Sequence, residues 1–383
     1  MTNYSIGAST KEQNTIQGKV NQEYINNLLS NNTKLIRSYF SDIKDDFDKE
    51  FLDVFLNNLK IKCEINKHEE IYILFNQQDI IKVFKYLIFR NRFRESGDKK
   101  ISFKAPTYLL IEPVSTCNLR CPFCFQTDKS FTKKPYMGVM NFDLFKKIVD
   151  EADSLKIGAI TIASRGEPTL HKNYKDMLKY IGEKKNIFEV KTNTNATFLN
   201  EDNCHAILKN NISQVVISSD HYIKEKYEKL RLGANFEKIV ENVDRLFNIR
   251  NTYYPNSITE IRISGIDNDR NLDRKLFHDF WIKRSDHVSA SYPMERWNTY
   301  ENNLHPEIND PCQYLWDRMY VWFDGKTNPC DADYKSYLSY GDVSKDTIEN
   351  IWNNQKLKEI RYSHSNNERN KVDPCNKCGV TFI

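Results

Sequence analysis

Residues 111–126 read IEPVSTCNLRCPFCFQ and place three cysteines directly after an apolar segment. Around this stretch, short β-rich runs alternate with helical patterns, which is typical of βα units on a parallel sheet. The expected strands lie at 108–112, 159–163, 188–192, 214–218, 260–264 and 287–291, and the expected helices lie near 141–155, 173–184, 200–210, 235–250 and 271–283. Six units are fewer than the eight of a closed barrel. The sequence therefore predicts an α/β fold, a partial TIM-like (β/α)6 barrel with the cysteine loop at the C-terminal end of its first strand.

The regions on either side of this barrel do not show its alternation of strand and helix patterns. We expect a disordered tail over residues 1–20 and a mostly helical region over 21–104, with the barrel over 105–295 and a cysteine-rich domain over 296–383. Within the helical region, the apolar spacing predicts two helices between 22 and 60, a short strand at 71–75 and a helix at 79–89. The basic stretch 82–104 is interpreted as a solvated linker face, with a phosphate- or partner-binding patch as the alternative.

Composition excludes several classes of protein. The chain has 383 residues with 56 Lys plus Arg against 52 Asp plus Glu, so its net charge of +4 does not favour nucleic-acid binding. No apolar run approaches the roughly 18 residues of a membrane span, and the N-terminus lacks a signal-peptide pattern. We expect a cytoplasmic protein with neither nucleic acid nor membrane as a partner.

Seven of the nine cysteines form two sets, and in a reducing compartment clustered cysteines bind metal or carry redox chemistry. The first set, Cys117, Cys121 and Cys124, has the spacing Cys-x3-Cys-x2-Cys. Three thiolates on one short loop can hold a four-iron cube and leave one iron without a protein ligand. The alternative is a three-cysteine zinc site completed by a distant His or Cys.

The second set lies in the last 72 residues and consists of Cys312, Cys330, Cys375 and Cys378. Cys312 and Cys330 flank an apolar run at 319–323 that a turn at Asp324-Gly325 follows, which predicts a hairpin. A helix is expected near 346–361, before Cys375-x2-Cys378. Four thiolates close a site, and on ligand count zinc and an iron–sulfur cluster both fit.

The first cysteine loop, with an aromatic residue, Phe123, before its third cysteine, resembles the radical SAM superfamily over residues 107–383. This resemblance implies a 4Fe-4S cluster on Cys117, Cys121 and Cys124 whose open iron chelates S-adenosylmethionine (SAM). Reductive cleavage of SAM then yields a 5′-deoxyadenosyl radical, for which an external one-electron reductant such as flavodoxin or ferredoxin is implied.

Other strand-end segments carry the same resemblance. ITIASRGEPTL (160–170) resembles the Gly-Gly-Glu-Pro motif, with Arg165 in place of the first glycine, and KTNTNATFL (191–199) resembles the Thr-Asn-Gly segment, with Asn195 where glycine is common. VVISSDHY (215–222) and RISGID (262–267) stand where the family contacts the SAM ribose and adenine. The implied SAM contacts are Phe123, Gly166, Glu167, Asn193, Ser218, Asp220 and Arg262. For Ser218 and Asp220 the alternative is a helix N-cap.

The tail resembles the SPASM and twitch extensions of this superfamily. Its order is Cys, Asp-Gly-x3-Pro-Cys, Gly-Asp-Val, Ile-Trp-Asn and Cys-x2-Cys. Four cysteines instead of seven imply the shorter twitch form, with one fully ligated auxiliary 4Fe-4S cluster. The 17-residue gap between Cys312 and Cys330 is similar to that of an aminocyclitol dehydrogenase in this family.

Three functions follow as hypotheses. The first is oxidation of a small sugar- or cyclitol-like substrate, in which the auxiliary cluster accepts an electron. The second is modification of a ribosomally made peptide by crosslinking, oxidation or epimerisation, with residues 1–100 binding its leader. The third is a zinc-binding module without radical chemistry.

Individual catalytic residues do not follow from the sequence. Arg262, His221 and the segment SYPMERW (291–297) are candidates for substrate contact. Cys63 and Cys204 are expected to be small buried hydrophobes, with a hydrogen-atom donor as the alternative.

Overall fold

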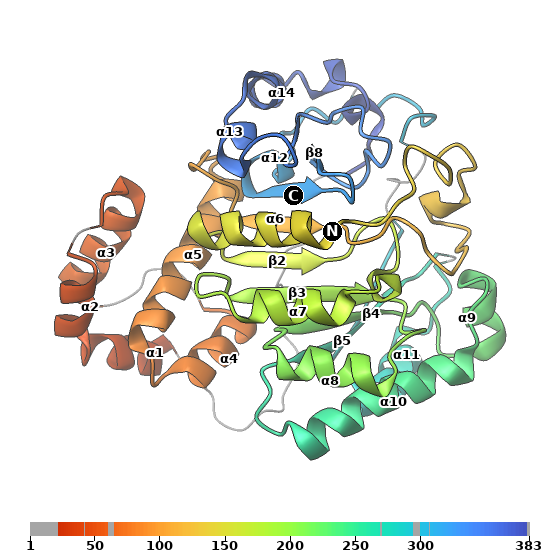
Figure 1. The fold of residues 1–383 in the computed structure, drawn as a ribbon, viewed down its shortest axis with the longest axis horizontal. Helices are drawn as coiled ribbons and strands as arrows, with labels where there is room; N and C mark the ends of the chain where they lie inside the picture. Colours follow the sequence, from red (N-terminus) through yellow and green to blue (C-terminus); the bar gives the residue numbers. More distant parts are fainter. Residues whose placement is uncertain are drawn as a thin grey trace. The chain divides into compact units, whose positions relative to one another are not determined.

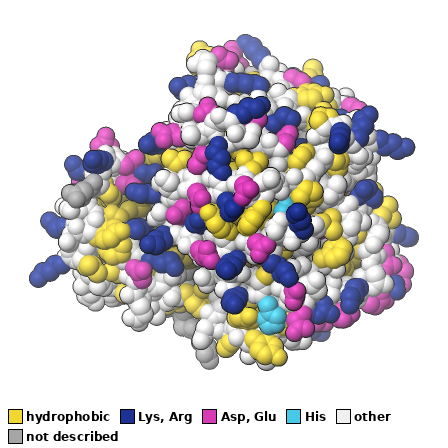
Figure 2. All heavy atoms as spheres, in the orientation of Figure 1, with side chains coloured by type: hydrophobic (Ala, Val, Ile, Leu, Met, Phe, Trp, Pro, Cys, Tyr) yellow, Lys and Arg dark blue, Asp and Glu magenta, His cyan; other side chains and the backbone are white. Residues whose placement is uncertain are grey.

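The structure is a computed structural model, and it describes residues 22–41, 43–59, 65–268, 270–293, 299–305 and 307–380. The chain divides into two compact units, one up to Glu95 and one over Ser96–Phe382. In the described residues no helix is both long enough and apolar enough to cross a membrane. Figure 2 shows basic and acidic side chains interspersed over the face that is drawn.

The described part of the first unit is helical. Its helices are α1 (Gln22–Ser30), α2 (Thr33–Tyr39), α3 (Asp46–Asn58), α4 (Lys67–Asn76) and α5 (Ile80–Asp98), which begins in the first unit and ends in the second. The strand predicted at 71–75 is wrong, because these residues lie in α4. The N-terminus of α4 has a capping box, in which the side chains of Asn66 and Glu69 each accept a hydrogen bond from the other's backbone N–H. This cap favours a helix despite the β-rich composition of IYILF.

The basic stretch at 82–104 is not a solvated linker. Residues up to Asp98 continue α5, and two arginines of this helix reach a fully buried carboxylate on α4. Arg90 Nε donates to Glu69 Oε1 at 2.6 Å, and Arg94 contacts the same oxygen. Arg92 pairs with Asp48 on α3 at 2.5 Å. These ion pairs hold α3, α4 and α5 together.

The second unit is built on one nine-stranded sheet of order β6-β5-β4-β3-β2-β1-β7-β8-β9 (Figure 1). The strands are β1 (Tyr108–Ile111), β2 (Ala159–Ile162), β3 (Glu189–Thr194), β4 (Gln214–Ser218), β5 (Glu260–Ile266), β6 (His287–Ser291), β7 (Arg318–Val321), β8 (Lys326–Asn328) and β9 (Gly341–Asp342). Strands β1 to β6 pair in parallel with their neighbours, which confirms the six predicted units. The sheet is an open, partial barrel, because β6 and β9 form its two ends.

Helices cover one face of this sheet (Figure 1). They are α6 (Phe142–Ser154), α7 (Tyr174–Gly182), α8 (Glu201–Lys209), α9 (Lys224–Leu230), α10 (Phe236–Tyr253) and α11 (Arg274–Trp281). The main hydrophobic core lies between these helices and alternate strand residues, such as Leu109, Ile160 and Val190. Because side chains alternate along a strand, the intervening residues belong to the other face.

The C-terminal segment is part of the same sheet. The predicted hairpin is present, since β7 and β8 pair antiparallel on either side of Asp324-Gly325. The sequence did not indicate that β7 also pairs in parallel with β1, in the register Tyr108 to Arg318. The helix predicted near 346–361 is two helices, α13 (Ile348–Trp352) and α14 (Gln355–Ser365), because Asn354 caps the second by accepting from Leu357 N at 2.9 Å. A short helix, α12 (Tyr314–Asp317), precedes β7.

Candidate metal centres

The three cysteines of the first set lie close together on the loop after β1. Burial, with a contribution from the neighbouring thiols, raises the pKa of Cys117 to about 11 and that of Cys124 to about 12. All eight cysteines in the described residues are free thiols. Buried thiols of this kind are deprotonated by binding a metal, which supplies the positive charge that the thiolates need.

A single metal ion and an iron–sulfur cluster need different arrangements of the thiols. Within the described ranges, no three His, Cys, Asp or Glu side chains are close enough together to hold one metal ion. Zinc needs all its thiolates about 2.3 Å from one atom, whereas a 4Fe-4S cube distributes them over separate irons.

Glu167 lies at the end of the loop that follows β2, with 3% of its surface exposed. Its Oε1 accepts hydrogen bonds from Thr169 Oγ1 at 2.5 Å and Thr194 Oγ1 at 2.7 Å, and its Oε2 accepts one from Asn195 N at 2.7 Å. Burial raises the pKa of the carboxyl group, which the hydrogen bonds oppose. Glu167 thus joins the ends of β2 and β3 beside the cysteine loop, since Asn195 Nδ2 also reaches Cys117 Sγ at 3.8 Å.

At position 166, where the loops after β1 and β2 pack against each other, there is no space for a side chain. A Cβ atom at this position would lie 2.3 Å from the carbonyl oxygen of Val114 and 2.4 Å from that of Thr116. Two buried polar atoms nearby along the strand ends, Ser164 Oγ and Asn193 Oδ1, have no hydrogen-bond partner in the described residues. A polar cofactor at these strand ends would supply partners for them, so this region fits SAM.

The left-handed backbone after β3 is at Ala196, with φ 64°. The sequence analysis placed Asn195 where glycine is common in the Thr-Asn-Gly segment, and the left-handed residue is the next one along the chain. Glycine is favoured where φ is positive, so Ala196 is the position at which this backbone favours glycine.

Asp220, just after β4, has a buried carboxylate that connects three neighbouring segments. It accepts from Arg231 Nε at 2.6 Å and from Ile266 N at 2.8 Å, which ties α9 and β5 to the end of β4. The Arg231 guanidinium lies over the ring of Phe123, 5.5 Å from its centre. Asp220 is not a helix N-cap, because α9 begins after Ile223 without a side-chain cap.

Two of the other candidates, Arg262 and His221, have hydrogen-bond partners. Ser218 is half-buried at the end of β4, Arg262 donates to Ser289 Oγ at 3.1 Å, and His221 Nδ1 accepts from the backbone of Tyr222 at 2.9 Å. Cys204 is fully buried in the core, as expected. Cys63 and residues 294–297 of the SYPMERW segment lie outside the described residues.

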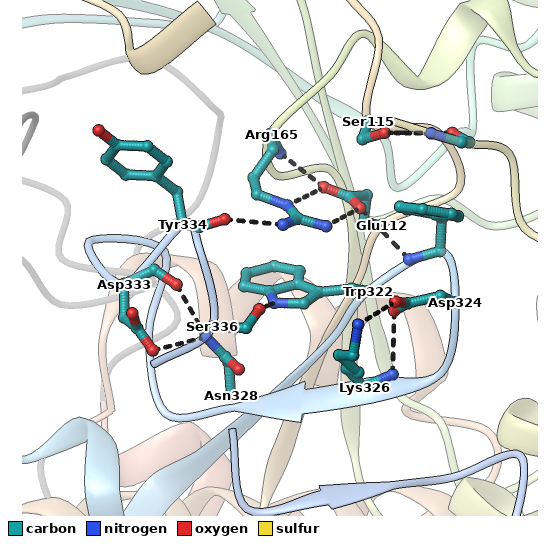
Figure 3. Close-up of polar contacts among 12 residues, drawn as sticks. Glu112, Ser115, Arg165, Trp322, Asp324, Lys326, Asn328, Asp333, Tyr334 and Ser336 are labelled. Atoms are coloured by element: carbon teal, nitrogen blue, oxygen red, sulfur yellow. Dashed lines mark hydrogen bonds and ion pairs between the residues drawn. The ribbon is translucent and has the colours of Figure 1, made fainter. Parts of the chain in front are cut away.

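Arg165, in place of the usual glycine, makes a buried ion pair that the sequence did not indicate (Figure 3). Its Nε and Nη2 each lie 2.6 Å from an oxygen of Glu112 at the end of β1, and the two side chains are 2% and 0% exposed. Its guanidinium packs on Trp322, 4.1 Å from a ring centre, and its Nη1 donates to Tyr334 O at 2.8 Å. Arg165 therefore connects the Gly-Glu-Pro loop to the segment that follows Cys330.

Tyr334 also connects the two cysteine-bearing segments. Its ring stacks on Phe125, the residue after Cys124, with ring centres 5.0 Å apart. Its hydroxyl donates to Asp128 Oδ2 at 3.0 Å, and Lys335 Nζ lies 2.7 Å from the same oxygen. The segment itself is held by the buried Asp333, which accepts from Asn328 Nδ2 at 3.0 Å (Figure 3).

The structure brings the four cysteines of the second set together. Burial raises the pKa of Cys312 to about 12 and those of Cys330 and Cys375 well above the ordinary thiol value, and the thiols of the set add to one another's effect. Sequence reasoning missed Arg369, which is 1% exposed. Its guanidinium donates to Cys378 O and Val380 O at 2.8 Å each, and its charge lowers the pKa of nearby Cys312 and Cys375. Arg369 thus folds the Cys-x2-Cys segment and favours thiolates there.

Two family models match the chain. Residues 111–269 match the radical SAM superfamily, and residues 312–379 match an iron-sulfur cluster-binding domain named SPASM. A tungsten-containing aldehyde ferredoxin oxidoreductase cofactor-modifying protein of Pyrococcus furiosus is 33% identical over 114 residues, 30% of this chain and 30% of that protein. The chain thus spans less than a third of this relative. An S-adenosyl-L-methionine-dependent 2-deoxy-scyllo-inosamine dehydrogenase of Niallia circulans is 22% identical over 282 residues, 71% of this chain and 92% of that protein.

Solved structures share the fold. BtrN in complex with AdoMet and 2-DOIA has a TM-score of 0.50 at 19% identity, over 73% of this chain and 95% of that chain. Streptococcus suis SuiB bound to precursor peptide SuiA has a TM-score of 0.56 at 14% identity, over 83% of this chain and 87% of that chain.

Proposed function

The chain is a radical SAM enzyme with a C-terminal SPASM domain, and we propose that it oxidises an alcohol of a small sugar- or cyclitol-like substrate to a ketone. Its cofactors are SAM and 4Fe-4S clusters. When bound, they supply a 5′-deoxyadenosyl radical that removes a hydrogen atom and a second cluster that accepts one electron.

One observation carries this proposal. The C-terminal segment gathers four thiols, enough to ligate every iron of a cube, and Tyr334 and Arg165 connect this segment to the loop with the first three thiols. A fully ligated cluster has no iron open for substrate and suits electron transfer. The similarity to an aminocyclitol dehydrogenase over 92% of its length supports the same reaction class.

We assign roles to the chain's own residues on this basis. Cys117, Cys121 and Cys124 hold the SAM-binding cluster, and Cys312, Cys330, Cys375 and Cys378 hold the auxiliary cluster. Glu167 orients the SAM ammonium, with Phe123, Gly166, Asn193, Ser218, Asp220 and Arg262 as further contacts around SAM. An external flavodoxin or ferredoxin supplies the first electron.

Modification of a peptide is the second candidate, and the likeness to a peptide-bound enzyme favours it at the level of the fold. A leader-binding domain of three helices and three strands is not supported, because residues 22–41, 43–59 and 65–95 contain helices and no strand. The zinc-module hypothesis is set aside, because both matching family models describe SAM or iron–sulfur chemistry.

The test is anaerobic incubation of the reconstituted enzyme with SAM, dithionite and a panel of polyols that includes 2-deoxy-scyllo-inosamine. Each candidate carries deuterium at its carbinol carbon. We expect a product lighter than its substrate by one hydrogen and one deuterium, with the deuterium recovered in 5′-deoxyadenosine. Deoxyadenosine without deuterium, and no ketone from any member of the panel, would contradict the proposal.

A further inference from the structure

The sheet face turned away from the helices is polar, in contrast to the apolar face described above. Its half-buried side chains include Lys191 and Asn193 on β3, Gln214 on β4, and Glu260 and Arg262 on β5. They alternate with core residues such as Val190 and Val215. This face therefore carries the groups that could contact a polar substrate.

Lys191 lies on β3, an inner strand of the sheet. It is in register with Thr161 on β2 and Gln214 on β4, and Gln214 is in turn in register with Glu260 on β5. Lys191 lies two residues before Asn193 on the same strand, about 7 Å toward the N-terminal end of the sheet. It is thus one layer below the strand ends at which Glu167 and the first cysteine loop lie.

The polar groups around Lys191 already have hydrogen-bond or ion-pair partners. Gln214 Nε2 donates to Glu260 Oε2 at 2.5 Å, Arg262 donates to Ser289, and Arg318 pairs with Asp317 at 2.6 Å. Lys191 has neither a hydrogen bond nor an ion pair in the described part of the chain. By contrast Lys184, also on the barrel, pairs with Asp150 at 2.6 Å.

The surroundings of Lys191 favour its neutral form. Burial, together with the charges of Arg262 and Arg318, lowers its pKa to about 8, although Glu260 and Glu189 oppose this effect. The ordinary value for lysine is about 10.4. Because the lowered pKa lies close to the physiological range, a minority of this amine is unprotonated at neutral pH and can accept a proton, whereas an ordinary lysine is almost fully protonated.

We propose that Lys191 Nζ is the proton acceptor of the oxidation. This inference rests on the proposed function. A hydrogen atom leaves the carbinol carbon for the deoxyadenosyl radical, the hydroxyl proton goes to Lys191 Nζ, and one electron goes to the auxiliary 4Fe-4S cluster. The C–H and O–H bonds break, the C=O double bond forms, and the substrate loses two electrons and two protons in total.

The first test needs no substrate. Trace acetylation of the holoenzyme with acetic anhydride over pH 6–11, read by mass spectrometry, gives the titration midpoint of each lysine. We expect a midpoint near pH 8 for Lys191, with the exposed Lys185 labelled in the same samples as a check on the reagent. A midpoint above pH 10, or no labelling of Lys191 at any pH, would overturn the proposal, because the acceptor must be both neutral and accessible.

The second test measures ketone and deoxyadenosine with Lys191→Met, Lys191→Arg and the control Lys185→Met, on the same polyol panel. Removing a general base costs about 10²- to 10⁴-fold, so we expect ketone formation to fall at least a hundredfold in both Lys191 variants. Arginine keeps the charge and cannot accept a proton, so it separates proton transfer from electrostatics. Deoxyadenosine formation should persist, which shows that the variants fold and bind SAM.

The pH dependence of ketone formation shows which protonation state of Lys191 is active. Wild-type ketone formation should rise with pH and level off above about pH 8, because the neutral amine is the active form. Ketone formation by either Lys191 variant at the wild-type rate would overturn the role of Lys191 alone. No ketone from the wild type would overturn the proposed function, and the role of Lys191 with it.

Discussion

Glu167 allows a test of SAM binding at a single carboxylate. Glu167→Gln keeps the size of the side chain but removes its charge. A charge-assisted hydrogen bond contributes about 1.5–3 kcal/mol, so SAM affinity should fall about ten- to a hundredfold. The measurement is equilibrium binding of SAM to the reconstituted protein, with the absorption spectrum as a check that the cluster is intact. The exposed Glu183→Gln is the matched control, and unchanged affinity in Glu167→Gln would leave Glu167 a purely structural role.

Substitution of Gly166 tests whether the loops after β1 and β2 must pack closely at this point. In Gly166→Ala the new methyl group would collide with two backbone carbonyls, so the β1 and β2 loops must separate. We expect a lower melting temperature together with weaker SAM binding. Gly97→Ala is the control, because a Cβ there has its nearest neighbour at 3.7 Å and alanine favours a helix. Equal melting temperatures for the two variants would contradict the packing role of Gly166.

At the residue scale, short motifs in the sequence were enough to predict a candidate site, because a few residues at fixed spacing determine local chemistry. The cysteine sets were singled out by their spacing, and Glu167 by the resemblance of residues 160–170 to the Gly-Gly-Glu-Pro motif. The contacts of Arg165 were missed because Glu112 and Tyr334 lie far away in the chain. An arginine in place of a motif glycine was the available signal. Arg369 was missed because its acceptors are nearby backbone carbonyls, which leave no side-chain pattern in the sequence. Lys191 carried no local signal, since its environment is set by residues on four other strands.

At the scale of elements, the Arg165–Glu112 ion pair joins β1, the loop after β2 and the segment after β8. Arg165→Met should leave the Glu112 carboxylate buried without its partner, which costs about 3–5 kcal/mol. For a unit of this size that corresponds to a fall of roughly 10 °C in melting temperature. Differential scanning calorimetry of the reconstituted protein measures it.

Two variants sharpen that experiment. The double variant Arg165→Met with Glu112→Gln should recover part of the loss, because no unpaired charge remains. Lys175→Met breaks the exposed pair with Asp202 and should change stability by less than about 1 kcal/mol. A melting temperature for Arg165→Met equal to that of Lys175→Met would show that the buried pair contributes little.

Helices and strands were predicted correctly where the spacing of apolar residues is regular. Strands β1 to β6 and their main helices follow from alternating apolar runs. The strand expected within α4 failed because Asn66 and Glu69 cap a helix at that point, and the linker expected at 82–104 failed because its arginines pair with carboxylates on other helices. Helix α9 is short and polar, so it gave no periodic signal.

At the scale of the whole molecule, the two thiol sets require about eight irons per chain if each holds a cube. Replacing Cys117, Cys121 and Cys124 with alanine should remove about half of the iron and abolish SAM cleavage. Iron analysis by atomic spectroscopy and deoxyadenosine assays measure the two effects. Zinc at both sites after anaerobic reconstitution would contradict the assignment.

The auxiliary set can be removed separately. Cys375→Ala with Cys378→Ala should spare SAM cleavage but suppress ketone formation, because the substrate radical then lacks an electron acceptor. Some loss of thermal stability is also expected, because metal binding and folding are coupled in small metal-binding segments. Full ketone yield from the folded double variant would favour a redox-neutral reaction such as epimerisation.

The continuity of the sheet from β6 to β9 has a consequence for dissecting this protein. A truncation before Cys312 removes β7 and leaves β1, the strand that leads into the first cysteine loop, as a bare sheet edge. Unpaired backbone N–H and C=O groups on an apolar strand recruit other chains and promote aggregation. The barrel and the C-terminal segment are therefore not interchangeable modules, and a chimera that exchanges the tail must carry a strand complementary to Tyr108–Ile111 to remain monodisperse.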